Sequence, residues 1–312
     1  MRASRQASDA RGGAAGIVLA ALLALSGPGT VAAASATGET PRRVVSMNLC
    51  TDQIAMLVAA PGQLISVSYL AARPDVSLMS AQTAGLTINH GLAEEIFRLD
   101  PDLVISGTYT RRATVNMLRR LGRRVEEFAP ANGFADIRQN VRRMGELLGR
   151  EAQAARLIAA FDAEAAALAA APSEGHEPGK ERLGKGAPVL GSFGANSFTT
   201  GGGTLENEIV GAAGLRHLGE ELEITGTTRL PLEALVLADP DYVLLWERSL
   251  ADPSRATEIL RHPALDARFG SERRLSADSR YWICGTPLTL EAVARLRAEA
   301  GGGTSLRPEA NR

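Results

Sequence analysis

A long helical stretch in the middle of the chain, from about Phe134 to Ala171, constrains the fold more than any other feature. Its apolar residues recur at steps of three and four, which is the spacing of one buried helical face. The pattern restarts after Gly149, so we expect a joint between two helices there. The second helix, residues 150–171, should end at Pro172, because proline lacks the N–H that would continue the helical hydrogen bonds.

A short sequence pattern occurs on both sides of this stretch. In each copy a glutamate opens an apolar helical pattern, and Asp-Pro-Asp and an apolar strand follow. The first copy runs from Glu94 to Ile105 and the second from Glu233 to Leu244. A helix, a proline stop and a buried strand are a common αβ connection, but so long a recurrence indicates two halves of similar architecture.

Both halves alternate strands with helices, which predicts an α/β fold with parallel sheets and helices on their faces. Strands are expected at residues 44–46, 64–67, 103–106 and 124–128 of the first half, and at 189–192, 242–245 and 274–276 of the second.

The N-terminus has the composition of a signal peptide. Three arginines in the first eleven residues precede an apolar run over residues 14–25, and Ala34-Ser35-Ala36 fits a cleavage site. The run is too short to span a bilayer comfortably, so we expect export with cleavage, and an uncleaved membrane anchor is the alternative.

The expected domain organisation follows from these boundaries. It comprises a signal peptide (1–36), an N-terminal lobe (37–149), an inter-lobe helix (150–171), a flexible Gly/Pro-punctuated connection (172–187), a C-terminal lobe (188–300) and a disordered tail (301–312). The apolar fraction of 45% suits a folded globular protein. A net charge of −1 gives no basic excess that would favour nucleic acid or a lipid surface as a partner.

Six loops are expected to face a ligand, because ligands of parallel α/β sheets bind beyond the carboxyl ends of the strands. These loops are residues 47–50, 68–73, 107–111, 193–203, 246–248 and 279–286. They concentrate the chain's few aromatic side chains, whose flat faces suit a large planar or amphipathic ligand, although each aromatic alone is equally suited to packing. Arginines in the same loops could meet carboxylates or an anionic chelate.

The candidate ligand-binding residues in these loops are Asn48, Cys50, Tyr69, Arg73, Tyr109, Arg111, Phe193, Phe198, Trp246, Arg248, Tyr281 and Trp282, with Arg112 and Arg280 as further cations.

Several short segments occur in an order that resembles a known family. They are Arg43-Val44-Val45-Ser46, Glu94 with Leu99 to Ile105, Leu121-Gly122, Thr199-Thr200-Gly201 with Thr204-Leu205, Ala213-Gly214-Leu215, and Glu233 with Asp239-Pro240-Asp241. In this order the chain from Arg42 to Glu299 resembles the periplasmic substrate-binding proteins of ABC importers for ferric siderophores, haem and cobalamin. The resemblance implies two Rossmann-like α/β lobes with parallel sheets, joined by one long α-helix, with a ligand cleft between the lobes.

The resemblance also implies a function. We expect a monomeric periplasmic receptor, not an enzyme, that captures a metal chelate and delivers it to an inner-membrane ABC permease, without a cofactor or a nucleic-acid partner. Ferric siderophore and cobalamin rank nearly equal as ligands, and haem is third. An aromatic residue after the second strand commonly faces ligand in similar proteins, which supports Tyr69.

Two glutamates are candidates for permease docking. Similar proteins place one exposed glutamate on each lobe, and these dock on arginines of the permease; by position they correspond to Glu94 and Glu233. The alternative is two solvated glutamates that the helix dipole favours at helix N-termini.

The two cysteines, Cys50 and Cys284, fall in candidate cleft loops, one in each half. Two cysteines in an oxidising periplasm often pair, and a disulfide here would staple the lobes across the cleft. The alternatives are a free thiolate that ligates haem iron or cobalt, and two unpaired cysteines.

Other classes of function have weaker support. The four histidines, His90, His176, His217 and His262, show no metal-ligand spacing, and no metal site is predicted. No nucleophile elbow, Walker loop or dinucleotide fingerprint is present. A free metal-ion receptor, a secreted α/β hydrolase and a metal-dependent enzyme stand as alternatives.

Overall fold

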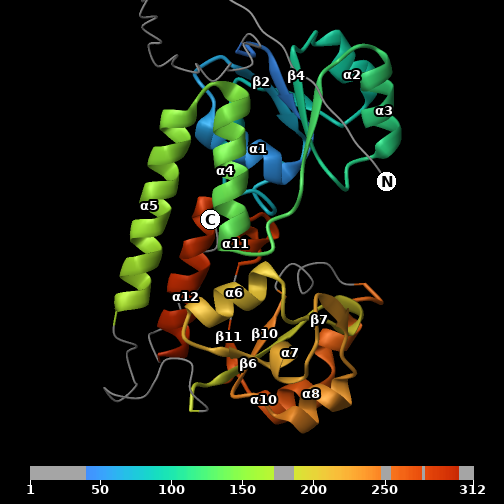
Figure 1. The fold of residues 1–312 in the computed structure, drawn as a ribbon. Helices are drawn as coiled ribbons and strands as arrows, with labels where there is room; N and C mark the ends of the chain where they lie inside the picture. The colour runs from blue at the N-terminus through green and yellow to red at the C-terminus, as the bar shows by residue number, and fades with distance from the viewer. Residues whose placement is uncertain (1–39, 172–185, 247–253, 276–277, 302–312) are drawn as a thin grey trace, which may run out of the picture. The chain divides into compact units, whose positions relative to one another are not determined.

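The computed structural model describes residues 40–171, 186–246, 254–275 and 278–301 (Figure 1). The predicted signal peptide, most of the connection over 172–187, Arg248, and the tail after residue 301 lie outside these described residues. No described helix is long and apolar enough to cross a membrane.

The N-terminal lobe contains a parallel five-stranded sheet in the order β3-β2-β1-β4-β5. Its strands are β1 (Val44–Ser46), β2 (Leu64–Ser68), β3 (Thr87–Asn89), β4 (Leu103–Gly107) and β5 (Val125–Phe128). Its helices are α1 (Leu49–Val58), α2 (Ala93–Arg98) and α3 (Arg112–Arg120), with a short 3₁₀ turn, η1 (Ser80–Thr83). Side chains alternate across the sheet: Val44 packs with α1, whereas Val45 packs with α2 and α3.

The C-terminal lobe contains a parallel four-stranded sheet in the order β11-β10-β6-β8 and an antiparallel pair, β7 and β9. The strands are β6 (Val189–Phe193), β7 (Phe198–Thr200), β8 (Arg216–His217), β9 (Thr227–Arg229), β10 (Tyr242–Leu245) and β11 (Arg274–Leu275). The helices are α6 (Leu205–Ala212), α7 (Leu218–Glu221), α8 (Leu232–Ala238), α10 (Pro263–Phe269), α11 (Arg280–Ile283) and α12 (Leu290–Ala300), with 3₁₀ turns η2 (Ala195–Ser197), η3 (Glu258–Arg261) and η4 (Pro287–Thr289).

The predicted fold class, two α/β lobes with parallel sheets, is therefore confirmed. The sequence did not indicate β3, β7, β8 and β9, because these short strands consist mostly of polar residues and lack an apolar pattern.

The repeated Asp-Pro-Asp motif occupies the same structural position in both lobes. Its first aspartates, Asp100 and Asp239, adopt left-handed backbone conformations with φ of 46° and 47° directly after α2 and α8. An arginine holds each side chain: Arg123 lies 2.7 Å from Asp100, and Arg273 lies 2.6 Å from Asp239.

The second aspartate of each motif aligns the first strand of its lobe. A carboxylate oxygen of Asp102 accepts the backbone N–H of Arg42 at 2.6 Å, just before β1. A carboxylate oxygen of Asp241 accepts the N–H of Val189 at 2.7 Å, at the start of β6. Strand β1 pairs with β4, and β6 pairs with β10, so the sequence repeat marks one strand connection built twice.

A hairpin of two helices connects the lobes. Helices α4 (Phe134–Leu148) and α5 (Glu151–Ala170) meet at Gly149, whose positive φ of 62° confirms the predicted joint. Helix α5 packs against α4 and also against α12 of the second half (Figure 1). The N-terminus of α4 likewise reaches the C-terminal lobe, because the N–H of Phe134 donates to Glu208 at 2.9 Å. The connection thus involves both helices and not α5 alone.

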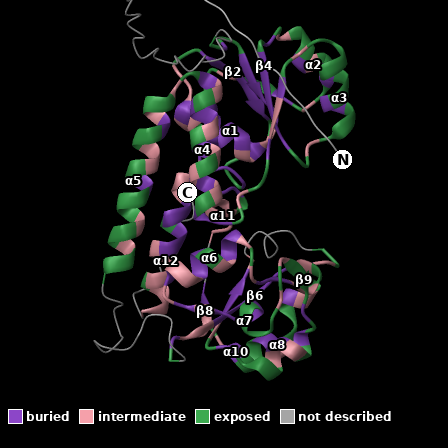
Figure 2. Ribbon diagram, viewed as in Figure 1, coloured by how far each residue is buried: buried purple, intermediate pink, exposed green. Residues whose placement is uncertain are grey.

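One hydrophobic core extends through both halves. A single cluster includes Ile105 of β4, Ile137 of α4, Leu244 of β10 and Leu290 of α12, each at most 1% exposed. In Figure 2 the strands of both sheets are buried, whereas the outer faces of α2, α3 and α5 are exposed. The two sheets are therefore held by shared apolar packing as well as by the chain connection.

A disulfide joins Cys50 and Cys284, with their Cα atoms 4.9 Å apart. Cys50 lies in the first turn of α1, which Asn48 caps by accepting the N–H groups of Cys50 and Thr51. Cys284 follows α11, is 2% exposed, and packs with Leu49. The bond holds the carboxyl end of β1 beside the segment that follows α11.

Replacing both cysteines, Cys50→Ser with Cys284→Ser, should lower the free energy of unfolding by about 2–4 kcal/mol. The reason is that the crosslink, which spans 234 residues, restricts the unfolded chain. Denaturant unfolding of the wild type and the double variant measures this difference. Thiol titration of the unfolded, unreduced protein should find no thiol, and two free thiols would contradict the pairing.

Asp52, in the first turn of α1, is completely buried and ties α1 to the end of β2. Its Oδ2 accepts hydrogen bonds from the backbone N–H of Ser68, at 3.1 Å, and from the Ser68 hydroxyl, whereas Oδ1 has no hydrogen-bond partner among the described residues. Burial raises the pKa of Asp52 to about 7, against the lowering effect of the hydrogen bonds from Ser68.

This raised pKa predicts a pH-dependent stability difference. Folded Asp52 keeps a proton that the unfolded chain releases above its ordinary pKa of 3.8, so its contribution to stability is complete below that pH and is lost as the pH rises through about 7. We expect Asp52→Asn to stabilise the protein relative to wild type at pH 8 by up to about 4 kcal/mol more than at pH 4. Thermal unfolding of both proteins at the two pH values tests this, and an equal difference at both would contradict it.

Candidate ligand cleft

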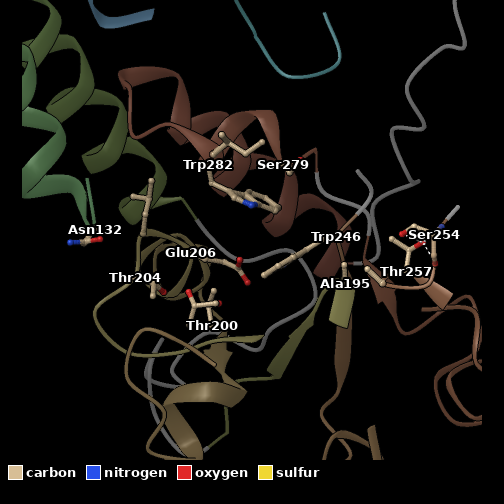
Figure 3. Close-up of a pocket in the computed structure, with 14 residues that line it drawn as sticks. Asn132, Ala195, Thr200, Thr204, Glu206, Trp246, Ser254, Thr257, Ser279 and Trp282 are labelled. Atoms are coloured by element: carbon tan, nitrogen blue, oxygen red, sulfur yellow. Dashed lines mark hydrogen bonds between the residues drawn. The ribbon is translucent and has the colours of Figure 1, made fainter. Parts of the chain in front are cut away.

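A cavity of about 580 Å³ lies in the C-terminal lobe, where α6 and α11 meet Trp246, the residue after β10 (Figure 3). Most of its lining comes from the second half, and Asn132 contributes from the segment just before α4. Its lining includes parts of three predicted loops, those over residues 193–203, 246–248 and 279–286.

Two tryptophans form the largest aromatic surfaces of this cavity. Trp246 directly follows β10, and Trp282 lies on α11. Trp246 fits against β6 only because residue 194 is glycine: a Cβ there would lie 2.0 Å from the indole ring. The structure therefore brings together two of the predicted aromatic residues in one cavity.

Glu206 is the charged residue of this cavity that the sequence did not single out as a site residue. It lies in the first turn of α6, whose N-cap Thr204 accepts the N–H of Asn207, and it is only 6% exposed. It shares the lining of the cavity with Trp246, Trp282 and Thr200 (Figure 3). A helical signal was available, because Glu206 falls on the same face as the apolar residues of α6.

The ring of His217 lies next to the carboxylate of Glu206. Its Nδ1 accepts the backbone N–H of Gly219 at 3.0 Å, and its Nε2 lies 3.3 Å from the hydroxyl of Thr200. The same Nε2 is 3.6 Å from Oε1 of Glu206, which is beyond hydrogen-bond distance. Among the described residues, no three His, Cys, Asp or Glu side chains gather in a way that could hold a metal ion.

The predicted residues of the N-terminal lobe lie outside the lining of this cavity. Tyr69 directly follows β2, is 44% exposed and stacks on the ring of His90 at 5.6 Å. Hydrogen bonding by the backbone N–H of His90, and secondarily by its ring, lowers the pKa of Glu95. Tyr109, after β4, is 88% exposed. Both tyrosines follow the carboxyl ends of strands, as predicted.

The described arginines that were predicted to meet an anionic ligand do not line this cavity. Arg73 pairs with Asp75. Arg280 pairs with Asp278, whose hydrogen bonds raise the pKa of the guanidinium, and it donates to the carbonyl of Pro74 at 2.6 Å. Arg111 and Arg112 are exposed at the start of α3, away from the cavity lining. Neighbouring aspartates therefore hold Arg73 and Arg280, and their contact with a ligand stays a prediction.

Three predicted aromatic residues contact other side chains of the protein and do not line the cavity. Phe193 is completely buried in the core of the C-terminal lobe, so its prediction as a ligand contact is wrong: strand alternation turns it inward. Tyr281 packs against the main core, with the guanidinium of Arg295 4.9 Å above its ring. Phe198, on β7, lies under Arg229 at 5.6 Å. Neither Tyr281 nor Phe198 lines the cavity.

Glu94 and Glu233 are both exposed in the first turns of α2 and α8. Neither side chain forms an ion pair or hydrogen bond with another described residue, so both carboxylates are available at the surface.

Comparison with known proteins identifies relatives by sequence. A family model described as periplasmic binding protein matches residues 44–272. A cobalamin-binding protein of Halobacterium salinarum is 26% identical over 205 residues, which make up 65% of this chain and 53% of the relative. The chain thus spans about half the length of the curated relatives it matches.

Solved structures share the fold. The periplasmic heme-binding protein RhuT from Roseiflexus sp. RS-1 superimposes with a TM-score of 0.68 at 22% identity, over 84% of this chain and 98% of that one. The periplasmic vitamin B12 binding protein BtuF of Vibrio cholerae gives 0.62 at 16% identity, over 85% and 99%. An ABC-type Fe³⁺-hydroxamate transport protein from Saccharomonospora viridis gives 0.61 at 16% identity, over 84% and 93%.

The matched family model and the two parallel α/β lobes agree, and the chain belongs to the periplasmic binding protein family, whose members bind solutes and are not enzymes.

Proposed function

We propose that this protein captures a metal chelate, cobalamin or a ferric siderophore, and delivers it to an ABC permease. The observation that carries the proposal is the cavity walled by Trp246 and Trp282. Its volume of about 580 Å³ falls within the usual range of small-molecule sites. Paired indole faces suit a large flat ligand, and the chelate binds with part of its surface against them. Haem is the third candidate.

The names of similar proteins support the same ligand class. They comprise a cobalamin-binding protein, heme-binding proteins, a vitamin B12 binding protein and an Fe³⁺-hydroxamate transport protein. All of these names denote large metal chelates or their transport. In our proposal the receptor acts as a monomer in the periplasm after removal of residues 1–36, and the tyrosines at the ends of β2 and β4 complete the ligand surface on the opposite lobe.

Delivery requires a docking surface, for which we propose Glu94 and Glu233. Each is exposed, lies at the same position of the repeated motif and is unpaired within the described part of the chain. Charge pairs at a solvated rim set the register and rate of association more than its affinity. This suits a receptor that has to dissociate from the permease after delivery.

Ligand capture predicts quenching of tryptophan fluorescence. Trp246 and Trp282 are the two tryptophans of the chain, so the whole signal comes from the cavity. We expect cyanocobalamin or a ferric siderophore to quench it saturably, because a bound chromophore lies against the indoles. Titration with cyanocobalamin, a ferric hydroxamate, a ferric catecholate and haem tests this. A folded protein that responds to none of them would refute the proposed function.

The docking proposal predicts separate effects on binding and transport. Glu94→Ala with Glu233→Ala should leave chelate affinity unchanged and lower uptake roughly tenfold, because the rim charges guide the complex with the permease. Uptake by cells that carry the cognate permease measures the second quantity. The matched control is Glu151→Ala with Glu258→Ala, which removes two exposed first-turn glutamates elsewhere. Equal uptake by the two double variants, or lost chelate binding in the folded docking variant, would exclude this role.

A further inference from the structure

One wall of the cavity is a short segment around α11. Ser279, Trp282 and Ile283 all line the cavity, and α11 itself is only four residues long. A single helical turn is not stable by itself, because forming it fixes several backbone angles for very few hydrogen bonds. The position of this wall therefore depends on the residues that surround it.

The disulfide ties one end of this wall to the N-terminal lobe. Cys284 directly follows α11, is 2% exposed and is bonded to Cys50 in the first turn of α1. The Sγ atom of Cys50 lies 3.7 Å from the carbonyl oxygen of Ile283, which lines the cavity. A residue of the first half thus lies directly behind a cavity wall of the second half.

Two further contacts hold the same segment against the first half. At the start of α11, Arg280 donates from Nη1 to the carbonyl oxygen of Pro74 at 2.6 Å, in the segment after β2. Beyond the disulfide, Gly285 packs so closely that a Cβ there would lie 2.3 Å from the Cβ of Ala131, just before α4. Residues of the N-terminal lobe therefore hold the segment at both ends of α11.

The two tryptophans of the cavity have different supports. Trp282 packs against the main core, and its neighbour Tyr281 lies under Arg295 of α12, but the segment that carries both is tied to the N-terminal lobe. Trp246, in contrast, directly follows β10, and its ring lies over Gly194, just after β6 of the same sheet. Only the Trp282 side of the cavity should respond to a loss of the ties to the other lobe.

We propose that the Cys50–Cys284 disulfide and Arg280 are positioning residues for Trp282, so that the N-terminal lobe sets one wall of the cavity and loss of the disulfide lowers the affinity for a chelate. The claim about affinity rests on the proposed function. A dithiol reductant would supply the two electrons and two protons: the S–S bond breaks, each cysteine sulfur takes a hydrogen, and the dithiol closes to a disulfide. A freed wall has to be ordered again on binding, which weakens binding about three- to tenfold.

Two single-tryptophan proteins test the positioning without any ligand. Trp246→Phe leaves Trp282 as the sole tryptophan, and Trp282→Phe leaves Trp246. Complete reduction with dithiothreitol, verified by titration of two thiols, should lower the fluorescence anisotropy of Trp282 and leave that of Trp246 unchanged. Introducing Cys50→Ser with Cys284→Ser into both proteins repeats the comparison without a reductant.

The affinity is compared between the wild type and the folded Cys50→Ser, Cys284→Ser variant, without a reductant that would also act on the metal of the chelate. Cyanocobalamin, a ferric hydroxamate and haem are the probes. The variant should bind the chelate that the wild type binds about three- to tenfold more weakly.

The variant Arg280→Gln removes the contact with Pro74 and keeps the disulfide. It should shift the affinity and the Trp282 anisotropy in the same direction as loss of the disulfide. The matched control is Arg119→Gln, because Arg119 also pairs with an acidic residue and donates to a backbone carbonyl, at 3.1 Å, but within the N-terminal lobe. The control should change neither quantity.

A lower anisotropy of Trp282 alone, together with weaker chelate binding, supports the proposal. Unchanged anisotropy of Trp282 after complete loss of the disulfide would overturn it, and so would an equal fall for both tryptophans, which a general loosening of the fold produces. Unchanged affinity would overturn the claim about binding and leave the proposed function intact. If the folded wild type binds no chelate, the proposed function and the claim about affinity both fail, whereas the anisotropy still decides the positioning of Trp282.

Discussion

The structure depends on a hydrophobic core that the two lobes share. One cluster includes side chains of β4 in the first sheet, of α4, and of β10 and α12 in the second half. Helix α5 packs along both α4 and α12, and the Cys50–Cys284 disulfide joins the lobes at a second place. A hinge between the lobes would have to break apolar packing or bend around a covalent bond. This favours small movements around a largely preformed cavity.

The cavity combines features that oppose one another in the free protein. Trp246 and Trp282 offer apolar area that a ligand can cover, whereas the Glu206 carboxylate and the Trp246 N–H are buried without partners. Burying a polar group without a hydrogen-bond partner costs free energy, so these two groups do not stabilise the folded domain.

The sequence predicted the site at the level of loops better than at the level of side chains. Trp246 and Trp282 were recognised because they fall in loops expected to face a ligand, and both line the cavity. Phe193 directly follows a predicted strand, but it is the last residue of β6 and is buried in the core. Arg73 and Arg280 looked available, but Asp75 and Asp278, each two positions away, hold them. Glu206 was not among the predicted site residues, because its neighbours in the cavity lining come from distant segments.

By itself, the sequence determined the alternation of strands and helices, the helical joint at Gly149 and the duplicated Asp-Pro-Asp connection, since each rests on contacts between residues close in the chain or on one residue's backbone preference. Tertiary structure alone decided three matters: that α4 as well as α5 reaches both lobes, that Cys50 and Cys284 come within bonding distance, and that Glu206 lines the same cavity as two tryptophans. Each of these depends on the packing of segments far apart in sequence, and local patterns carry no information about such distances.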